Sequence, residues 1–379
     1  MGTTESVIGE SFWSETKPVV LSPEVGLEEW LDRQSHLLGH VLFKTSGSTG
    51  HAKYVCLSRA ALRASAAMVN DHLQATEADV WLGVLPEYHV GGFGVAARAS
   101  LLGCGVVLTR SEWSPRSFCE EASICGATLT SLVPTQVFDL VDQRCQAPST
   151  LRAVLVGGGN LEPDLEERAR ALGWPLLKTF GMTETASQVA TQAMGSDQEA
   201  PMMLLLGWEA HTNEDSLLRV RGDALFSGYV WWNGKDYHFD DTGEWFLTSD
   251  FVRLKGRQLE FVGRSQHRLK IKGELVHLAA LRLDLERVAR ALGVDPLAAT
   301  LIAVSHPRDE HALVLITEKQ LSSDQHLMLQ NGYNERAIGL VRLFESFVVP
   351  ELPRTSLGKL REAELQQMVD ALTSPNSLP

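Results

Sequence analysis

The fold is decided between residues 38 and 177, which contain five short apolar runs: Val41-Leu42-Phe43, Val80-Trp81-Leu82-Gly83-Val84-Leu85, Gly105-Val106-Val107-Leu108, Thr128-Leu129-Thr130-Ser131-Leu132 and Val154-Leu155-Val156. Each run has the length of a strand, and several lack polar alternation, which is typical of strands buried on both faces. Helical patterns separate the runs. After Ser58, a candidate N-cap, the apolar stripe of Leu62, Ala66 and Val69 has helical spacing. Strands that alternate with helices predict a largely parallel α/β sheet.

Two later regions have different patterns of apolar and turn-forming residues. From about residue 204 to 262, turn pairs such as Asn233-Gly234 interrupt short strands, which predicts a β-rich subdomain. After Gly263-Arg264, apolar residues at 281, 285, 288 and 292 predict a helix, and strands follow near residues 301–304 and 313–316. We therefore expect an α/β protein with a large N-terminal domain and a small C-terminal α+β domain.

Composition and charge limit the class of protein. Of the 379 residues, 44% are hydrophobic and 21% charged, which excludes a disordered chain and predicts roughly two or three domains. The net charge of −13 disfavours a general nucleic-acid partner, so an anionic ligand needs a local basic site. The five cysteines form no CxxC pair, and no apolar stretch approaches a membrane span of roughly 20 residues. We expect a cytoplasmic protein with no stable membrane insertion.

The strongest local signal directly follows the first apolar run: Thr45-Ser46-Gly47-Ser48-Thr49-Gly50-His51-Ala52-Lys53. Its hydroxyl groups and backbone N–H groups can wrap a polyphosphate, and Lys53 adds positive charge. It is not a Walker A loop, because His51 follows Gly50. A surface turn rich in Gly and Ser is the alternative interpretation.

A second candidate site is Lys178-Thr179-Phe180-Gly181-Met182-Thr183-Glu184, which also follows a strand. Ligands bind α/β sheets at the carboxyl ends of strands. The aromatic ring, hydroxyl and carboxylate of this segment suit a base, a phosphate oxygen and a magnesium ion. A helix cap is the alternative interpretation.

Five further segments or residues carry candidate chemistry. Gly157, Gly158 and Gly159 allow a backbone to approach a flat ligand, and Asp250 can bridge two ribose hydroxyls, although both segments also suit plain turns. One basic stretch has positive residues at every second position of its second half, and its sequence is Gly263-Arg264-Ser265-Gln266-His267-Arg268-Leu269-Lys270-Ile271-Lys272-Gly273. It suits an anion-binding site, and a solvent-exposed basic strand is the alternative interpretation. His89 lies on a glycine-flanked turn, and Lys359 on a Pro/Gly loop. A structural histidine and a solvated lysine are the alternatives.

The order and spacing of these segments resemble the acyl-adenylate-forming (AMP-binding) superfamily of acyl-CoA synthetases, adenylation domains and luciferases, over nearly the whole chain. By this resemblance, the five segments starting at Thr45, Phe180, Thr248, Gly263 and Pro353 are the phosphate loop, the adenine and magnesium motif, the ribose motif, the hinge and the C-terminal lysine motif. Two segments are similar to the o-succinylbenzoate-CoA ligases of menaquinone biosynthesis, namely His89-Val90-Gly91-Gly92 and Gly181-Met182-Thr183-Glu184-Thr185-Ala186-Ser187-Gln188.

The resemblance implies a ligase that joins a carboxylic acid to ATP, releases pyrophosphate and transfers the acyl group to coenzyme A, with Mg²⁺ as cofactor. Residues 1–265 are then a large AMP-binding domain, and residues 266–379 a mobile lid with its hinge near Gln266. The implied catalytic residues are Lys359, Thr183, Glu184 and His89, and Glu184 is also the implied metal ligand. His89, Ser187 and Gln188 are implied for the acid. The implied cofactor-binding residues are Thr45, Ser46, Gly47, Ser48, Thr49, Gly50, Lys53, Gly157, Gly158, Gly159, Phe180, Gly181, Asp250, Arg264, Lys270, Lys272 and Gly273.

Three positions depart from the family pattern: Ala52 replaces proline, Phe180 replaces tyrosine, and Gln266 replaces aspartate at the hinge. Because the phosphate-loop segment starts at Thr45, we expect the protein to lack most of the N-terminal subdomain of longer relatives, as short forms of the ligase do. The sequence leaves the oligomeric state open, with a homodimer as one option. Two alternative functions remain, another aryl- or acyl-CoA synthetase and a nucleotide-binding module that has lost catalysis.

Overall fold

The computed structural model describes residues 8–9, 11–45, 53–109, 112–214, 216–264, 268–271, 274–306, 310–336, 342–354 and 360–373. The chain divides into two compact units, Met1–Thr248 with Arg253–Phe261, and Ser249–Val252 with Val262–Pro379. Strands β15 (Phe246–Lys255) and β16 (Gln258–Arg264) contribute residues to both units. The domain boundary after residue 265 stays a prediction, because the hinge residue Gln266 lies outside the described residues.

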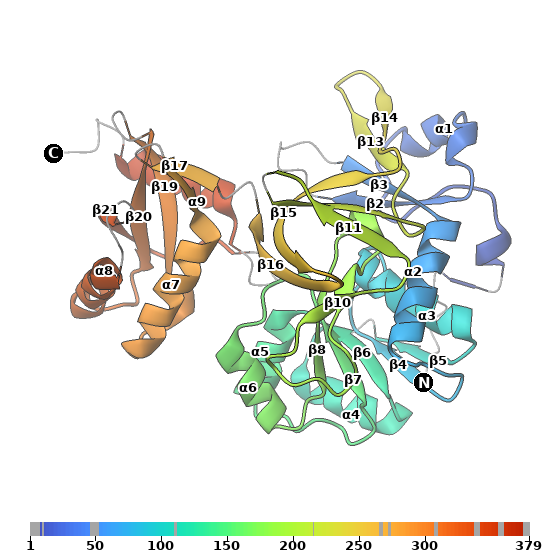
Figure 1. Ribbon diagram of the computed structural model, residues 1–379, viewed down its shortest axis with the longest axis horizontal. Helices are drawn as coiled ribbons and strands as arrows, with labels where there is room; N and C mark the ends of the chain where they lie inside the picture. Colours follow the sequence, from blue (N-terminus) through green and yellow to red (C-terminus); the bar gives the residue numbers. More distant parts are fainter. Residues whose placement is uncertain are drawn as a thin grey trace. The chain divides into compact units, whose positions relative to one another are not determined.

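A parallel sheet forms the centre of the first unit, with strand order β8-β7-β6-β4-β5 (Figure 1). Its strands are β4 (Val80–Gly83), β5 (Gly105–Leu108), β6 (Leu129–Leu132), β7 (Ala153–Val156) and β8 (Leu176–Phe180). All residues of β6 and β7 are buried, as expected of central parallel strands covered on both faces. The predicted α/β class is confirmed.

Helices cover the sheet. The apolar sides of α4 (Pro115–Cys125), α5 (Pro134–Asp142) and α6 (Pro163–Ala171) share one core cluster with β4, β6, β7 and β8. Helices α2 (Arg59–His72) and α3 (Val90–Leu102) pack against each other, and α3 also packs against β4 and β6. The predicted N-cap is confirmed, because the Ser58 hydroxyl accepts a hydrogen bond from the Ala61 N–H at 3.0 Å.

The first apolar run does not belong to the parallel sheet. Strand β2 (His40–Thr45) pairs antiparallel with β3 (Lys53–Ser58) and lies in a second sheet with β1 (Val19–Val20), β13 (Gly228–Trp232) and β14 (Tyr237–Asp241). The reason is the short connection over residues 46–52. A parallel crossover needs a dozen or more residues, so neighbouring strands this close in sequence form a hairpin. Helix α1 (Leu27–Leu31) packs on this sheet.

The predicted β-rich region, about residues 204–262, is confirmed: it contains β11 (Trp208–Thr212) and β12 (Leu217–Gly222) together with β13, β14, β15 and most of β16. Two short strands, β9 (Ala190–Thr191) and β10 (Met202–Leu204), precede it. Strand β9 pairs antiparallel with β8 and with β10, so the parallel sheet continues beyond β8 as a mixed sheet.

The second unit has its own sheet and core. Its strands are β17 (Arg268–Ile271), β18 (Glu274–His277), β19 (Ala299–His306), β20 (Glu310–Glu318) and β21 (Leu343–Val349). Along β20, Leu313 and Leu315 pack with α7 (Leu278–Ala291) and α8 (Ser323–Arg336), while Val314 and Ile316 pack with α9 (Glu362–Thr373). This alternation places helices on both faces of the sheet and confirms the predicted α+β character.

Candidate active site

A tight loop follows β8 and carries the second candidate motif. The chain leaves β8 at Phe180 and returns in β9, with Phe180 paired to Ala190. A Cβ atom at Gly181 would collide with the carbonyl group of Ser187, so this close approach requires glycine. Ala186 (φ 50°) and Ser187 (φ 108°) have positive φ values, which side-chain-bearing residues adopt at a cost of order 1–3 kcal/mol.

The glycine segment lies beside this loop. Strands β7 and β8 are parallel neighbours, with Val156 paired to Lys178, so their carboxyl ends meet at one edge of the sheet. A Cβ atom at Gly157 would lie 2.9 Å from the Thr179 methyl group. Phe180 is buried, and its ring centroid lies 5.6 Å from that of the exposed Phe261. The structure thus brings together the two segments predicted to contact adenine.

Two other predicted residues, Lys53 and Glu184, both contact Tyr229, a tyrosine that no motif indicated. The Tyr229 hydroxyl donates a hydrogen bond to Glu184 Oε1 at 2.8 Å, and Lys53 Nζ lies 5.4 Å from the centroid of the Tyr229 ring. Burial and the neighbouring Glu184 carboxylate raise the pKa of Tyr229, so its hydroxyl stays protonated and remains a donor.

The Glu184 carboxylate fits a magnesium ion that arrives with a nucleotide. It is partly exposed, and its Oε2 accepts no hydrogen bond from a described residue. Within the described ranges, no group of three or more His, Cys, Asp or Glu side chains could hold a metal ion. Mg²⁺ is commonly held by one or two carboxylates together with substrate phosphates, and Glu184 can supply the protein's share of such a site.

A buried cation that the sequence could not place lies next to the motif loop. Arg98 in α3 is 1% exposed, and its guanidinium donates long hydrogen bonds to Ser131 Oγ at 3.5 Å and Ser187 Oγ at 3.4 Å. Its Cζ lies 5.4 Å from the centroid of the Trp81 ring, and its Nε has no partner within the described part of the chain. Burial lowers the pKa of Arg98 to about 9. The signal available in the sequence was that Arg98 is the single charged residue of the largely apolar helix Val90–Leu102.

The other two residues predicted for the acid have different environments. His89 is the exposed N-cap residue of α3, and partial desolvation lowers the pKa of its ring. Gln188 is buried, and its Oε1 accepts a hydrogen bond from the Thr191 hydroxyl at 2.7 Å. The Gln188 amide oxygen therefore contacts β9, while Ser187 contacts Arg98.

Asp250 and Arg264, predicted for the ribose, form an ion pair. Arg264 Nε donates to Asp250 Oδ1 at 2.7 Å. Asp250 is buried, which raises the pKa of its carboxyl group, and the positive charge of Arg264 opposes that rise. The guanidinium thereby fixes the orientation of a buried carboxylate.

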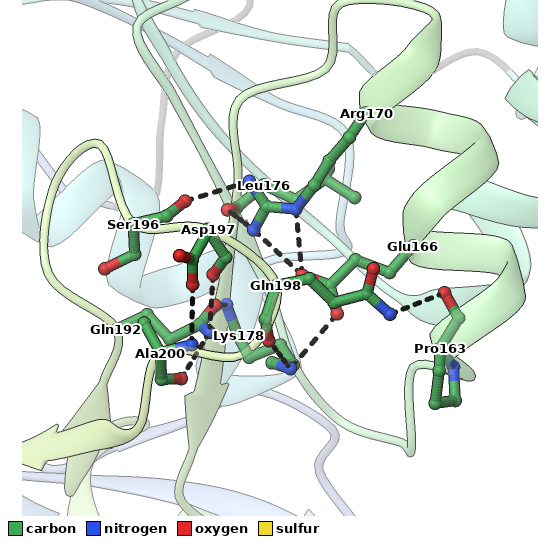
Figure 2. A network of polar contacts seen from close by, with 10 residues as sticks. All are labelled: Pro163, Glu166, Arg170, Leu176, Lys178, Gln192, Ser196, Asp197, Gln198 and Ala200. Atoms are coloured by element: carbon green, nitrogen blue, oxygen red, sulfur yellow. Dashed lines mark hydrogen bonds and ion pairs between the residues drawn. The ribbon is translucent and has the colours of Figure 1, made fainter.

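A buried acid anchors the strand that precedes the motif. Glu166 in α6 is fully buried and faces two cations, Arg170 at 2.8 Å and Lys178 at 3.1 Å (Figure 2). Lys178 Nζ also donates to the Gln198 carbonyl oxygen, and Arg170 to that of Ser196. This network ties α6 and the loop before β10 to β8, two residues ahead of Phe180.

Replacement of Glu166 by Gln should destabilise the protein by about 2–3 kcal/mol. The loss of a buried partner leaves two cations uncompensated, and their partial exposure reduces the effect below the ~3–5 kcal/mol typical of fully buried pairs. Urea unfolding measures the change. The matched control is Glu209→Gln, which removes an exposed partner of Arg221 and should change stability much less than Glu166→Gln, because water screens an exposed ion pair. Equal effects of the two variants would contradict the role of the network.

Several predicted residues lie outside the described part of the chain: Ser46, Gly47, Ser48, Thr49, Gly50, Lys272, Gly273 and Lys359. Lys270 lies in β17, opposite Leu275 of β18. Thr45 and Lys53 flank the phosphate-loop segment and pair with each other at the loop end of the β2–β3 hairpin. Their assignments as ligand-binding residues stay predictions.

A parallel α/β core with candidate ligand loops at the carboxyl ends of β7 and β8 is the arrangement in which α/β sheets bind ligands. The family model described as AMP-binding enzyme matches residues 40–230, and the chain belongs to this family.

The chain is similar to known 2-succinylbenzoate–CoA ligases. It is 30% identical to the ligase of Staphylococcus epidermidis over 85% of this chain and 68% of the relative, and 27% identical to that of Bacillus velezensis over 86% and 68%. Its fold matches the o-succinylbenzoate CoA synthetase of Bacillus subtilis, solved with an acyl-adenylate intermediate, with a TM-score of 0.73 at 23% identity over 86% of this chain and 68% of that one. Within the described residues, no helix combines the length and apolar character needed to cross a membrane.

Proposed function

We propose that this protein adenylates o-succinylbenzoate with ATP and then transfers the acyl group to coenzyme A, a step of menaquinone biosynthesis. The family and the relatives' names support the reaction class. Arg98 is the observation that supports this substrate.

A buried guanidinium without a carboxylate partner is unfavourable, because desolvation of a charge costs several kcal/mol. Arg98 has hydroxyl and aromatic neighbours but no carboxylate partner among the described residues. o-Succinylbenzoate has two carboxylates, of which only one reacts with ATP. The second carboxylate can compensate the charge of Arg98, beside Ser187 in the motif loop.

The first half-reaction requires that charge on the ATP phosphates be neutralised. We assign this role to Lys359, to Thr183 and to the hydroxyl and N–H groups of residues 46–50. Magnesium, when bound, adds electrostatic stabilisation at the same phosphates through Glu184. The acid carboxylate attacks the α-phosphate, pyrophosphate leaves, and the reaction needs no nucleophile from the protein.

The second half-reaction transfers the acyl group from AMP to the thiol of coenzyme A. We propose that the small domain then rotates about Gln266, withdraws Lys359 and presents residues 270–273, including Lys270, Lys272 and Gly273, to the pantetheine arm. Alternation of this kind lets one site serve two reactions.

Pyrophosphate release with a panel of acids tests the proposal. We expect turnover with ATP, Mg²⁺ and o-succinylbenzoate to exceed that with benzoate or medium-chain fatty acids, and mass spectrometry to detect the CoA thioester. Preference for another acid would retain the reaction class and reject the substrate. ATP binding without turnover of any acid would instead indicate a non-catalytic nucleotide-binding module.

We also propose a cytoplasmic location, where ATP and coenzyme A are available. The homodimer stays a prediction, and light scattering of the purified protein tests it.

A further inference from the structure

Tyr229 contacts two groups that bind one ligand, MgATP, if Glu184 holds the metal ion as proposed and Lys53 belongs to the phosphate loop as the sequence predicts. Its hydroxyl lies 2.8 Å from Glu184 Oε1, and its ring faces Lys53 Nζ at 5.4 Å. Glu184 is assigned to the metal ion and Lys53 to the phosphates. They come from segments more than a hundred residues apart in sequence, and Tyr229 from a third.

The position of Tyr229 is itself well fixed. Strand β13 pairs with β3, with Tyr229 opposite Val55, and the Tyr229 ring packs edge-on against Phe226 at 4.8 Å. The Phe226 N–H donates to the Glu184 carbonyl oxygen at 2.9 Å. The segment 226–229 therefore holds Glu184 by its backbone as well as by its carboxylate.

We propose that Tyr229 is a positioning residue that orients the Glu184 carboxylate for Mg²⁺ and Lys53 for the phosphates of ATP. The inference rests on the proposed function. The hydroxyl engages Oε1 and leaves Oε2 available, which restricts rotation of the carboxylate. Replacement of a group that orients a metal ligand in this way typically lowers metal affinity or activity 10- to 100-fold.

The hydroxyl and the ring have separable roles, which two substitutions distinguish. Tyr229→Phe removes only the hydrogen bond to Glu184, so it should weaken the effect of Mg²⁺ and leave metal-free ATP binding unchanged. Tyr229→Leu also removes the aromatic face beneath Lys53. It should therefore weaken metal-free ATP binding as well, about two- to fivefold, as expected for a partly exposed cation–π contact.

Isothermal titration calorimetry gives the readout without turnover. The quantity compared is the ratio of the ATP dissociation constant in EDTA to that in excess Mg²⁺. Tyr229→Phe should lower this ratio about tenfold relative to wild type. The matched control is Tyr54→Phe, since Tyr54 is a buried tyrosine whose hydroxyl donates to the Ser22 carbonyl oxygen at 2.9 Å. Its ratio should equal that of the wild type.

Glu184→Gln separates failure of the inference from failure of the proposed function. If Glu184→Gln lowers the ratio and Tyr229→Phe does not, the positioning role is rejected and the proposed function stands. If the wild-type protein binds no ATP, or if Glu184→Gln leaves the ratio unchanged, the assigned metal site is rejected together with the inference. A reduced ratio in both variants, with Tyr54→Phe unchanged, supports it.

Discussion

Lys359→Ala is expected to slow pyrophosphate release about 10²–10³-fold, the usual consequence of losing a preorganised group that stabilises charge in the transition state. Thioester formation from supplied acyl-adenylate should persist at a near wild-type rate, because the proposed rotation withdraws Lys359 before coenzyme A reacts. Single-turnover assays measure the two half-reactions separately.

Lys319→Ala is the control for this experiment. Lys319 is an exposed lysine of the same unit, and its replacement should affect neither half-reaction. Equal loss of both half-reactions in Lys359→Ala would show that the lysine serves both and would reject the proposed alternation.

Arg98→Met is expected to lower kcat/KM for o-succinylbenzoate about 30- to 1,000-fold, equivalent to about 2–4 kcal/mol, the range for loss of one partner of a buried charge pair. Activity with benzoate, which has no second carboxylate, should change little. The free protein should be no less stable than wild type, because methionine removes an uncompensated buried charge while keeping much of the side-chain volume.

Arg59→Met supplies the comparison for Arg98. Arg59 is also a buried arginine, but it donates to the Lys17 carbonyl oxygen and packs on Phe12. Its replacement should lower stability without changing the preference among acids. A stability loss in Arg98→Met with unchanged acid preference would assign Arg98 a structural role and reject it as the carboxylate partner.

The predicted elements that proved correct depend on local pattern. Apolar runs identified β4 to β7, of which β4, β6 and β7 are largely buried and β5 is a more exposed edge strand. The Ser58 cap with its helical stripe identified α2, because helix capping depends on residues near in sequence. The prediction failed for the sheet partner of residues 41–43. The apolar character of a segment indicates a buried strand but does not determine which strand pairs with it. The pairing of β2 with β3 follows from the short connection between them.

The sequence by itself determined the family, the order of its ligand-binding segments and the hydrophobic patterns of both units. Only the tertiary structure decided which side chains meet: Arg98 with Ser187, Glu166 with Lys178, and Tyr229 with Glu184. A sequence motif consists of residues that are close together along the chain, whereas these contacts join residues on different strands and helices. Their desolvation and hydrogen bonding exist only after the sheets have assembled, and for that physical reason no local pattern of residues could have revealed them.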